Sequence, residues 1–173
     1  EYFDKTILYL FKTLFNLNLK YRVRDKQNSI EVVVGSKGLF NYLKLLGISP
    51  APKYYKQIPQ PVNTPVILNH FLRGLFDTDG CLSISNKRNP EFPFYPRIII
   101  AQKCKELIQN LEKVLKMMGF SVYSRYNETL ADSRGNFHTR HRLEINGTQN
   151  LNNWIEKVGF HNPRNLSKLN KYI

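Results

Sequence analysis

The stretch "FLRGLFDTDG", residues 71–80, combines a helical pattern of apolar side chains with an ending in two carboxylates and a glycine. Leu72, Leu75 and Phe76 recur at the spacing that places them on one buried face of a helix. We therefore predict a helix over this stretch that packs one side into a core and ends near residue 77.

Asp77 and Asp79 lie at the end of this predicted helix. The helix macrodipole disfavours a carboxylate there by a few tenths of a kcal/mol, roughly, so each should have a positive partner. Arg73, four residues before Asp77, can form an ordinary helical ion pair. A divalent cation is the natural partner for the other carboxylate, because Mg²⁺ prefers one or two carboxylates plus water and phosphate oxygens. We assign Arg73 to Asp77 and the metal to Asp79.

Gly74 and Thr78 lie one turn apart and leave little side chain on their face of the helix. Glycine inside a helix costs about 1 kcal/mol relative to alanine, so a compensating contact is expected. Close approach of a second helix would provide that contact, and packing on the chain's own sheet is the alternative. We predict that Gly74 and Thr78 form a helix interface.

The chain contains a repeated order of elements: helix, strand, strand, helix. Apolar positions Leu10, Leu14 and Leu17 correspond to Leu111, Leu115 and Met118, and polar hairpins, the second over 127–139, join the strands. We predict an α+β chain with three parts: an αββα copy over 1–48, a proline-rich linker over 49–64, and a longer unit over 65–173 that opens with Thr64 as N-cap. This unit should end in a C-terminal helix that begins at Pro163 with Asn162 as its cap. The first copy lacks the opening helix and hairpin of the second.

Lys and Arg number 26 against 13 Asp and Glu, for a formal charge of +13 and a pI near 9.8. Such an excess favours a polyanionic partner, with nucleic acid first and an anionic membrane second. We expect no membrane partner, because the sequence lacks an apolar run near 18 residues. Two cysteines and no signal peptide favour an intracellular protein, cytoplasmic in a prokaryote or organellar.

"LRGLFDTDG", residues 72–80, resembles the nine-residue LAGLIDADG motif, with six letters identical. The order of elements is similar to that of the two-repeat homing endonucleases that carry the motif in inteins and archaea. The resemblance implies a saddle of αββαββα repeats whose antiparallel sheets lie in the major groove of double-stranded DNA. It also implies that the Gly74/Thr78 face meets a second motif helix, from a missing N-terminal segment or from another chain.

The resemblance further implies metal-dependent hydrolysis of phosphodiester bonds, which leaves 3′ overhangs. Asp79 and Gly80 would bind Mg²⁺ or Mn²⁺, and Gln102 would orient water near the metal. The active-site lysine of the family has three candidates after the last strands, Arg164, Lys168 and Lys171, with Lys103 as a further cation. We choose Lys168, so the predicted catalytic residues are Asp79, Gln102 and Lys168.

The predicted strands alternate polar and apolar residues, so one face of each can meet base edges and phosphates. The predicted DNA contacts are Lys20, Arg22, Arg24, Ser83, Ser85, Lys87, Arg97, Tyr123, Arg125, Arg140 and Arg142.

Two functional classes remain open from the sequence. The first is a sequence-specific DNA homing endonuclease, whether free-standing, intron-encoded or carried in an intein. The second is a non-cleaving nucleic-acid-binding protein on the same scaffold, such as an RNA-splicing maturase or a transcription regulator. The four histidines show no metal-ligand spacing, so a histidine-based nuclease centre is not expected.

Overall fold

The computed structural model divides the chain into two units, Glu1–Leu45 and Leu46–Ile173. It describes residues 2–24, 29–48, 58–59, 64–86, 94–132 and 134–172. Most of the predicted linker over 49–64 therefore lies outside the described residues.

The first unit has the predicted order of helix, strand, strand, helix. Its elements are α1 (Tyr2–Phe15), β1 (Lys20–Arg24), β2 (Ser29–Val33) and α2 (Lys37–Leu45), and the two strands pair antiparallel. α1 ends at Phe15 because Asn16 takes a left-handed conformation with φ of 51°. Leu17, expected in line with the helix, lies beyond it. Among the described side chains of this unit, only Leu39 is a buried hydrophobic residue.

The second unit has the seven predicted elements in the predicted order, followed by one further helix. They are α3 (Pro65–Asp79), β3 (Gly80–Asn86), β4 (Phe94–Gln102), α4 (Lys105–Met117), β5 (Val122–Ala131), β6 (Phe137–Asn146), α5 (Thr148–Lys157) and α6 (Pro163–Asn170). The strands form one antiparallel sheet in the order β3-β4-β6-β5. α6 begins as expected of an Asn-Pro pair, because the Asn162 side chain accepts the N–H of Arg164.

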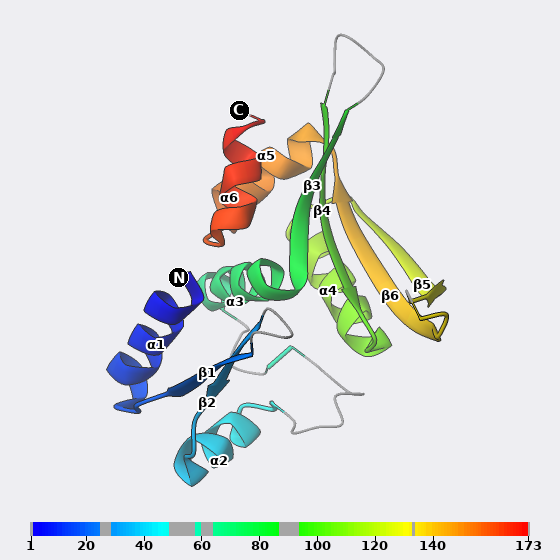
Figure 1. Ribbon diagram of the computed structural model, residues 1–173. Helices are drawn as coiled ribbons and strands as arrows, with labels where there is room; N and C mark the ends of the chain where they lie inside the picture. The colour runs from blue at the N-terminus through cyan, green and yellow to red at the C-terminus, as the bar shows by residue number, and fades with distance from the viewer. Residues whose placement is uncertain are drawn as a thin grey trace. The chain divides into compact units, whose positions relative to one another are not determined.

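The hydrophobic core lies between this sheet and helices α3, α4 and α5, which stand on one side of the sheet in Figure 1. Trp154 of α5 is fully buried at its centre, with ring centroids 4.7 Å from Phe76 and 5.8 Å from Phe120. Its indole N–H donates to the Gly159 carbonyl at 3.1 Å. The buried tryptophan thus packs against α3 at Phe76, one turn before the helix ends.

The polar hairpin predicted over 127–139 is wrong in its bounds. β5 continues to Ala131 and β6 begins at Phe137, so the turn occupies only the residues between them. The pairing survives because a register shift between Arg125 and Glu128 absorbs one extra residue, and Asn127 there has φ of 59°. A bulge of this kind keeps a polar stretch in the sheet although its alternation is broken.

The start of α3 also differs from the expectation. Thr64 is extended and precedes Pro65, but its side chain makes no capping hydrogen bond. Pro65, with its fixed φ and missing N–H, therefore accounts for the helix start without help from the threonine hydroxyl.

Two glycines of the motif differ in the space around them, and this difference predicts opposite effects of alanine. A Cβ on Gly80 would lie 2.8 Å from the Phe76 carbonyl oxygen and 2.9 Å from its ring, whereas one on Gly74 meets no described atom within 4 Å. Gly80→Ala should lower the free energy of unfolding by roughly 1–3 kcal/mol through overpacking. As long as no second helix covers this face, Gly74→Ala should raise it by about 0.5–1 kcal/mol, because alanine suits a helix interior.

Urea denaturation of both variants beside the unchanged chain measures these effects. A Gly80→Ala protein as stable as the original would contradict the close packing of Gly80 against Phe76. A Gly74→Ala protein less stable than the original would mean that another surface covers this face in solution.

Candidate functional site

Asp79 stands where α3 passes into β3 without a connecting loop, since the helix ends at Asp79 and the strand begins at Gly80. Its side chain is exposed. Gln102, at the end of β4, donates from Nε2 to Oδ2 of Asp79 at 2.8 Å. Two predicted catalytic residues 23 positions apart in sequence are therefore in direct contact.

Asp77 does not pair with Arg73, and the ion pair expected from their spacing is wrong. The Asp77 carboxylate is 8% exposed and accepts the backbone N–H of His161 at 2.7 Å. Arg73 instead donates to the Nε2 of His161 at 2.9 Å and to the Nδ1 of His70. The carboxylate at the helix end is thus compensated by N–H groups of the segment from His161 to Asn165 rather than by a neighbour on α3.

Lys168, the third predicted catalytic residue, is half-buried on α6. Its Nζ donates to the Leu82 carbonyl of β3 at 2.7 Å. Leu82 is three residues beyond Asp79, so the lysine lies beside the same junction but is engaged with the backbone. A catalytic role for Lys168 remains a prediction.

Register in the sheet places the predicted DNA contacts of the second unit on a single face. Ser83 pairs with Arg97, Arg97 with Asn146, and Arg125 with Arg142. Ile98 and Ile100, each 1% exposed, point to the opposite side and into the core. The sequence of β4 does not show which of its residues face the core. The register shows that Arg97 faces away from the helices.

We call this surface the polar sheet face. Its predicted contact residues are Ser83, Ser85, Arg97, Tyr123, Arg125, Arg140 and Arg142. Lys87 lies outside the described residues. Lys20, Arg22 and Arg24 are on β1 of the first unit, where Arg22 and Arg24 are exposed and Arg24 pairs with Glu31 at 2.7 Å.

Two glutamates hold the arginines of the polar sheet face along the strands. Arg142 pairs with Glu144 at 2.7 Å. Arg140 and Arg125 pair with Glu128 at 3.1 and 3.7 Å. Glu128 was not predicted for this face, because the bulge at Asn127 reverses the alternation there and the sequence carries no plain signal for it.

Tyr123 contributes to the same face. Its hydroxyl accepts from the Nε of Arg125 at 3.3 Å, and this hydrogen bond raises the pKa of the Arg125 guanidinium. The guanidinium also lies over the tyrosine ring, 5.3 Å from its centroid. The arginine is therefore fully charged and oriented by an aromatic neighbour.

Three buried polar atoms of the polar sheet face have no hydrogen-bond partner among the described residues. They are the Nε atoms of Arg97 and Arg142 and the Oδ1 of Asn146. Buried donors and acceptors are almost always satisfied in folded proteins, so unpaired ones indicate a surface whose partner is water or a ligand.

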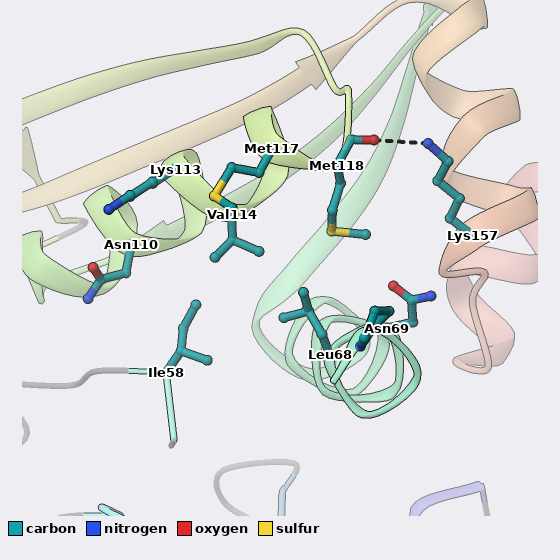
Figure 2. A pocket seen from close by; sticks show the side chains of 10 residues that line it. Ile58, Leu68, Asn69, Asn110, Lys113, Val114, Met117, Met118 and Lys157 are labelled. Atoms are coloured by element: carbon teal, nitrogen blue, oxygen red, sulfur yellow. Dashed lines mark hydrogen bonds between the residues drawn. The ribbon is translucent and has the colours of Figure 1, made fainter. Parts of the chain in front are cut away.

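An apolar cavity of about 670 Å³ lies on the helix side of the unit, away from the polar sheet face. Figure 2 shows Leu68 of α3, Val114 and Met118 around it, with Ile58 at its edge. Lys157 stands at the rim and donates to the Met118 carbonyl at 2.9 Å. None of the predicted catalytic residues lines this cavity, so it has no part in the candidate site.

Among the described residues, no three His, Cys, Asp or Glu side chains cluster as metal ligands. A metal at Asp79 would thus rest on one carboxylate, which fits Mg²⁺ when water and phosphate oxygens supply the other positions. Within the described part of the chain, no helix is both long and apolar enough to span a bilayer.

Residues 67–159 match the family model described as the LAGLIDADG-like domain. The match covers more than half of the chain, which therefore belongs to this family and has its α+β fold with antiparallel sheets.

Two curated relatives align with the chain. One is the replication factor C small subunit of Methanocaldococcus jannaschii, 24% identical over 164 residues, or 95% of this chain. The other is the replicative DNA helicase DnaB of Rhodothermus marinus, 25% identical over 121 residues, or 69% of this chain. The chain spans only 8% and 12% of the length of these two relatives.

Two solved structures are also similar to the chain. I-CvuI, a homing endonuclease in complex with its target, is 18% identical with a TM-score of 0.40, covering 61% of this chain and 64% of its own. I-SmaMI, bound to an uncleaved DNA target, is 12% identical with a TM-score of 0.37, covering 79% and 43%.

The two carboxylates of the motif should differ in their contribution to stability. Asp77→Ala removes a buried acceptor of hydrogen bonds and should lower the free energy of unfolding by about 2–3 kcal/mol. Asp79→Ala removes an exposed group with one side-chain partner and should cost about 1 kcal/mol or less. Chemical denaturation of both variants measures the difference, and equal losses would contradict the assignment of separate roles.

Proposed function

We propose that this chain is a sequence-specific double-stranded DNA endonuclease that hydrolyses phosphodiester bonds with a divalent metal at Asp79 and leaves 3′ overhangs. The observation that carries the proposal is the contact between Asp79 and Gln102, at the end of the two strands that bear Ser83, Ser85 and Arg97. Membership of the LAGLIDADG-like family supports it, as does the net charge of +13.

The donor set at the junction suits a hard cation, Mg²⁺ or Mn²⁺, held by the Asp79 carboxylate with Gly80 beside it. Such an ion, when bound, polarises a phosphate and lowers the pKa of a bound water. Gln102 restrains the carboxylate by donating to its Oδ2, which fixes the direction in which the acid points. Lys168 stays a proposed catalytic residue, and to reach a phosphate it has to leave the Leu82 carbonyl.

The polar sheet face is the proposed DNA surface. Arginines can contact phosphates or guanine edges, and the serines and Tyr123 can bond to either. The pairs with Glu128 and Glu144 hold the guanidinium groups in place before DNA arrives. We extend the proposal to Lys20, Arg22, Arg24 and Lys87 as further DNA contacts.

Cutting both strands needs a second acid. We propose that the exposed Gly74/Thr78 face of α3 packs against a second motif helix, supplied by another segment of the protein or by another chain. Thr78 directs its hydroxyl back to the carbonyl oxygens of Gly74 and Leu75, at 3.0 and 3.1 Å, so the face offers no unpaired polar group to such a helix.

Asp79→Asn should abolish DNA cleavage and leave DNA affinity nearly unchanged, because it removes a metal ligand while keeping the shape of the side chain. The substrate is a duplex selected by binding from a randomised library, assayed for cleavage with Mg²⁺ and for affinity without it. Glu156→Gln, an exposed change on α5, is the control and should cut normally. A variant that still cuts at the original rate would refute the metal assignment.

DNA affinity should fall steeply with salt, and the polar sheet face should account for much of the slope. Each phosphate contact adds roughly 0.9 to the slope of log K against log salt concentration, so Arg140→Ala with Arg142→Ala should lower it by up to about 2. The charge-matched control is Lys113→Ala with Lys157→Ala, on the helix side shown in Figure 2. A slope that responds equally to both pairs would place the DNA elsewhere.

A further inference from the structure

The segment from His161 to Lys168 contacts the α3–β3 junction on both sides of Asp79 without touching Asp79 itself. Before Asp79, the backbone N–H of His161 and the side-chain amide of Asn162 donate to the carboxylate and the carbonyl of Asp77, both at 2.7 Å. After Asp79, Lys168 donates to the Leu82 carbonyl at 2.7 Å. The end of the helix and the start of the strand are thus fastened to the same segment.

Asn165 is the one residue of this segment that bridges both sides. Its side chain is almost fully buried, with the residue 3% exposed. Its Nδ2 donates to Oδ1 of Asp77 at 3.4 Å, and its Oδ1 accepts the backbone N–H of Leu82 at 3.2 Å. A single amide therefore spans the five-residue step from Asp77 to Leu82, with Asp79 in the middle.

Asn165 bonds to the outer edge of β3, which has no other described strand beside it. β3 pairs with β4 on its inner edge. On its outer edge, Lys168 of α6 donates to the Leu82 carbonyl and Asn165 of α6 accepts the Leu82 N–H. An unpaired edge can move unless side chains cover it. A Cβ at Gly80 would lie 2.8 Å from the Phe76 carbonyl oxygen, so the passage from helix to strand is closely packed against the last turn of α3.

We propose that Asn165 is a positioning residue for the proposed metal site: it acts through Asp77 and Leu82 to fix the junction, and so the direction of the Asp79 carboxylate. The inference rests on the proposed function of Asp79. Both side-chain hydrogen bonds of Asn165 go to Asp77 and Leu82 rather than to Asp79, and removing a residue that supports a metal site from outside its ligands costs about 10–100-fold in metal affinity or activity.

Asn150 provides the control because it is also a buried asparagine, 8% exposed, and its side chain hydrogen-bonds to the backbone of neighbouring elements. It accepts from the N–H of Ser121 at 3.1 Å and donates to the Asn146 carbonyl at 2.7 Å. It ties α5 to Ser121, just before β5, and to the end of β6, none of which carries Asp79. Because the side chain of Asn150 makes three hydrogen bonds and that of Asn165 two, Asn150→Ala should cost at least as much stability. A larger effect of Asn165→Ala on metal use therefore isolates the positioning role.

The test compares Asn165→Ala with Asn150→Ala at a temperature where circular dichroism shows both folded. For Asn165→Ala we expect cleavage at saturating DNA to fall at least about tenfold and the half-saturating Mg²⁺ concentration to rise several-fold, with DNA affinity unchanged. Asn150→Ala should change each quantity less than about twofold. Equal effects of the two variants on cleavage and Mg²⁺ dependence would overturn the proposal.

Amide hydrogen exchange of the metal-free protein gives a readout that does not depend on cleavage. Asn165→Ala should speed exchange at Gly80, Cys81 and Leu82 by about tenfold or more, whereas Asn150→Ala should act at Ser121. If the unchanged chain cuts no DNA, the proposed function fails, and the exchange result still decides whether Asn165 holds the junction. Unchanged exchange at these amides overturns the inference in either case.

If Asn165→Ala does not fold, Lys168→Met tests whether α6 holds the edge of β3. It removes the bond to the Leu82 carbonyl and keeps the aliphatic stem of the side chain. Exchange at Cys81 and Leu82 should rise in this variant as well. Exchange identical to that of the unchanged chain would contradict the role of α6 at this edge.

Discussion

The direct passage of α3 into β3 is the constraint on which the rest of the second unit depends. No loop separates Asp79 from Gly80, and the Gly80 backbone lies so close to Phe76 that a methyl group would not fit. Phe76 is in turn packed on the buried Trp154. The backbone that carries the exposed Asp79 carboxylate is therefore anchored to the hydrophobic core, which is what the proposed metal ligand requires.

One sheet serves both stability and recognition because its side chains alternate between two faces. Leu82, Ile98 and Ile100 point into the core, while their neighbours in sequence supply the polar sheet face. Arg125, Arg140 and Arg142 are restrained by Glu128 and Glu144. Such ion pairs weaken the attraction of the arginines for an anion but limit the side-chain entropy that they lose on binding. Four helices complete the unit without covering the arginines.

Elements with a strong period could be predicted from the sequence, whereas features that depend on distant partners could not. The periodic helices α3 and α4, the order of the elements and the Asn162-Pro163 start of α6 follow from local rules. The ion pair of Arg73 with Asp77 satisfies the same local rules and is wrong. Asp77 instead accepts the N–H of His161, 84 positions further along the chain, a contact that only the fold reveals.

The extent of the hairpin of β5 and β6 is a second feature that the sequence alone could not predict. Alternation breaks at Asn127, and only the pairing with β6 reveals that the strand continues and brings Glu128 to the polar sheet face. Asn165 has no signal in sequence at all, since its importance comes from bridging Asp77 and Leu82 in space.

The most direct measurement is a crystal structure of the chain with a selected DNA duplex and Mn²⁺, using the anomalous signal of the metal. We predict an anomalous peak bound to the Asp79 carboxylate and in contact with a DNA phosphate, with the duplex lying on the polar sheet face. A duplex on the helix side, or Mn²⁺ bound away from Asp79, would contradict the proposed site.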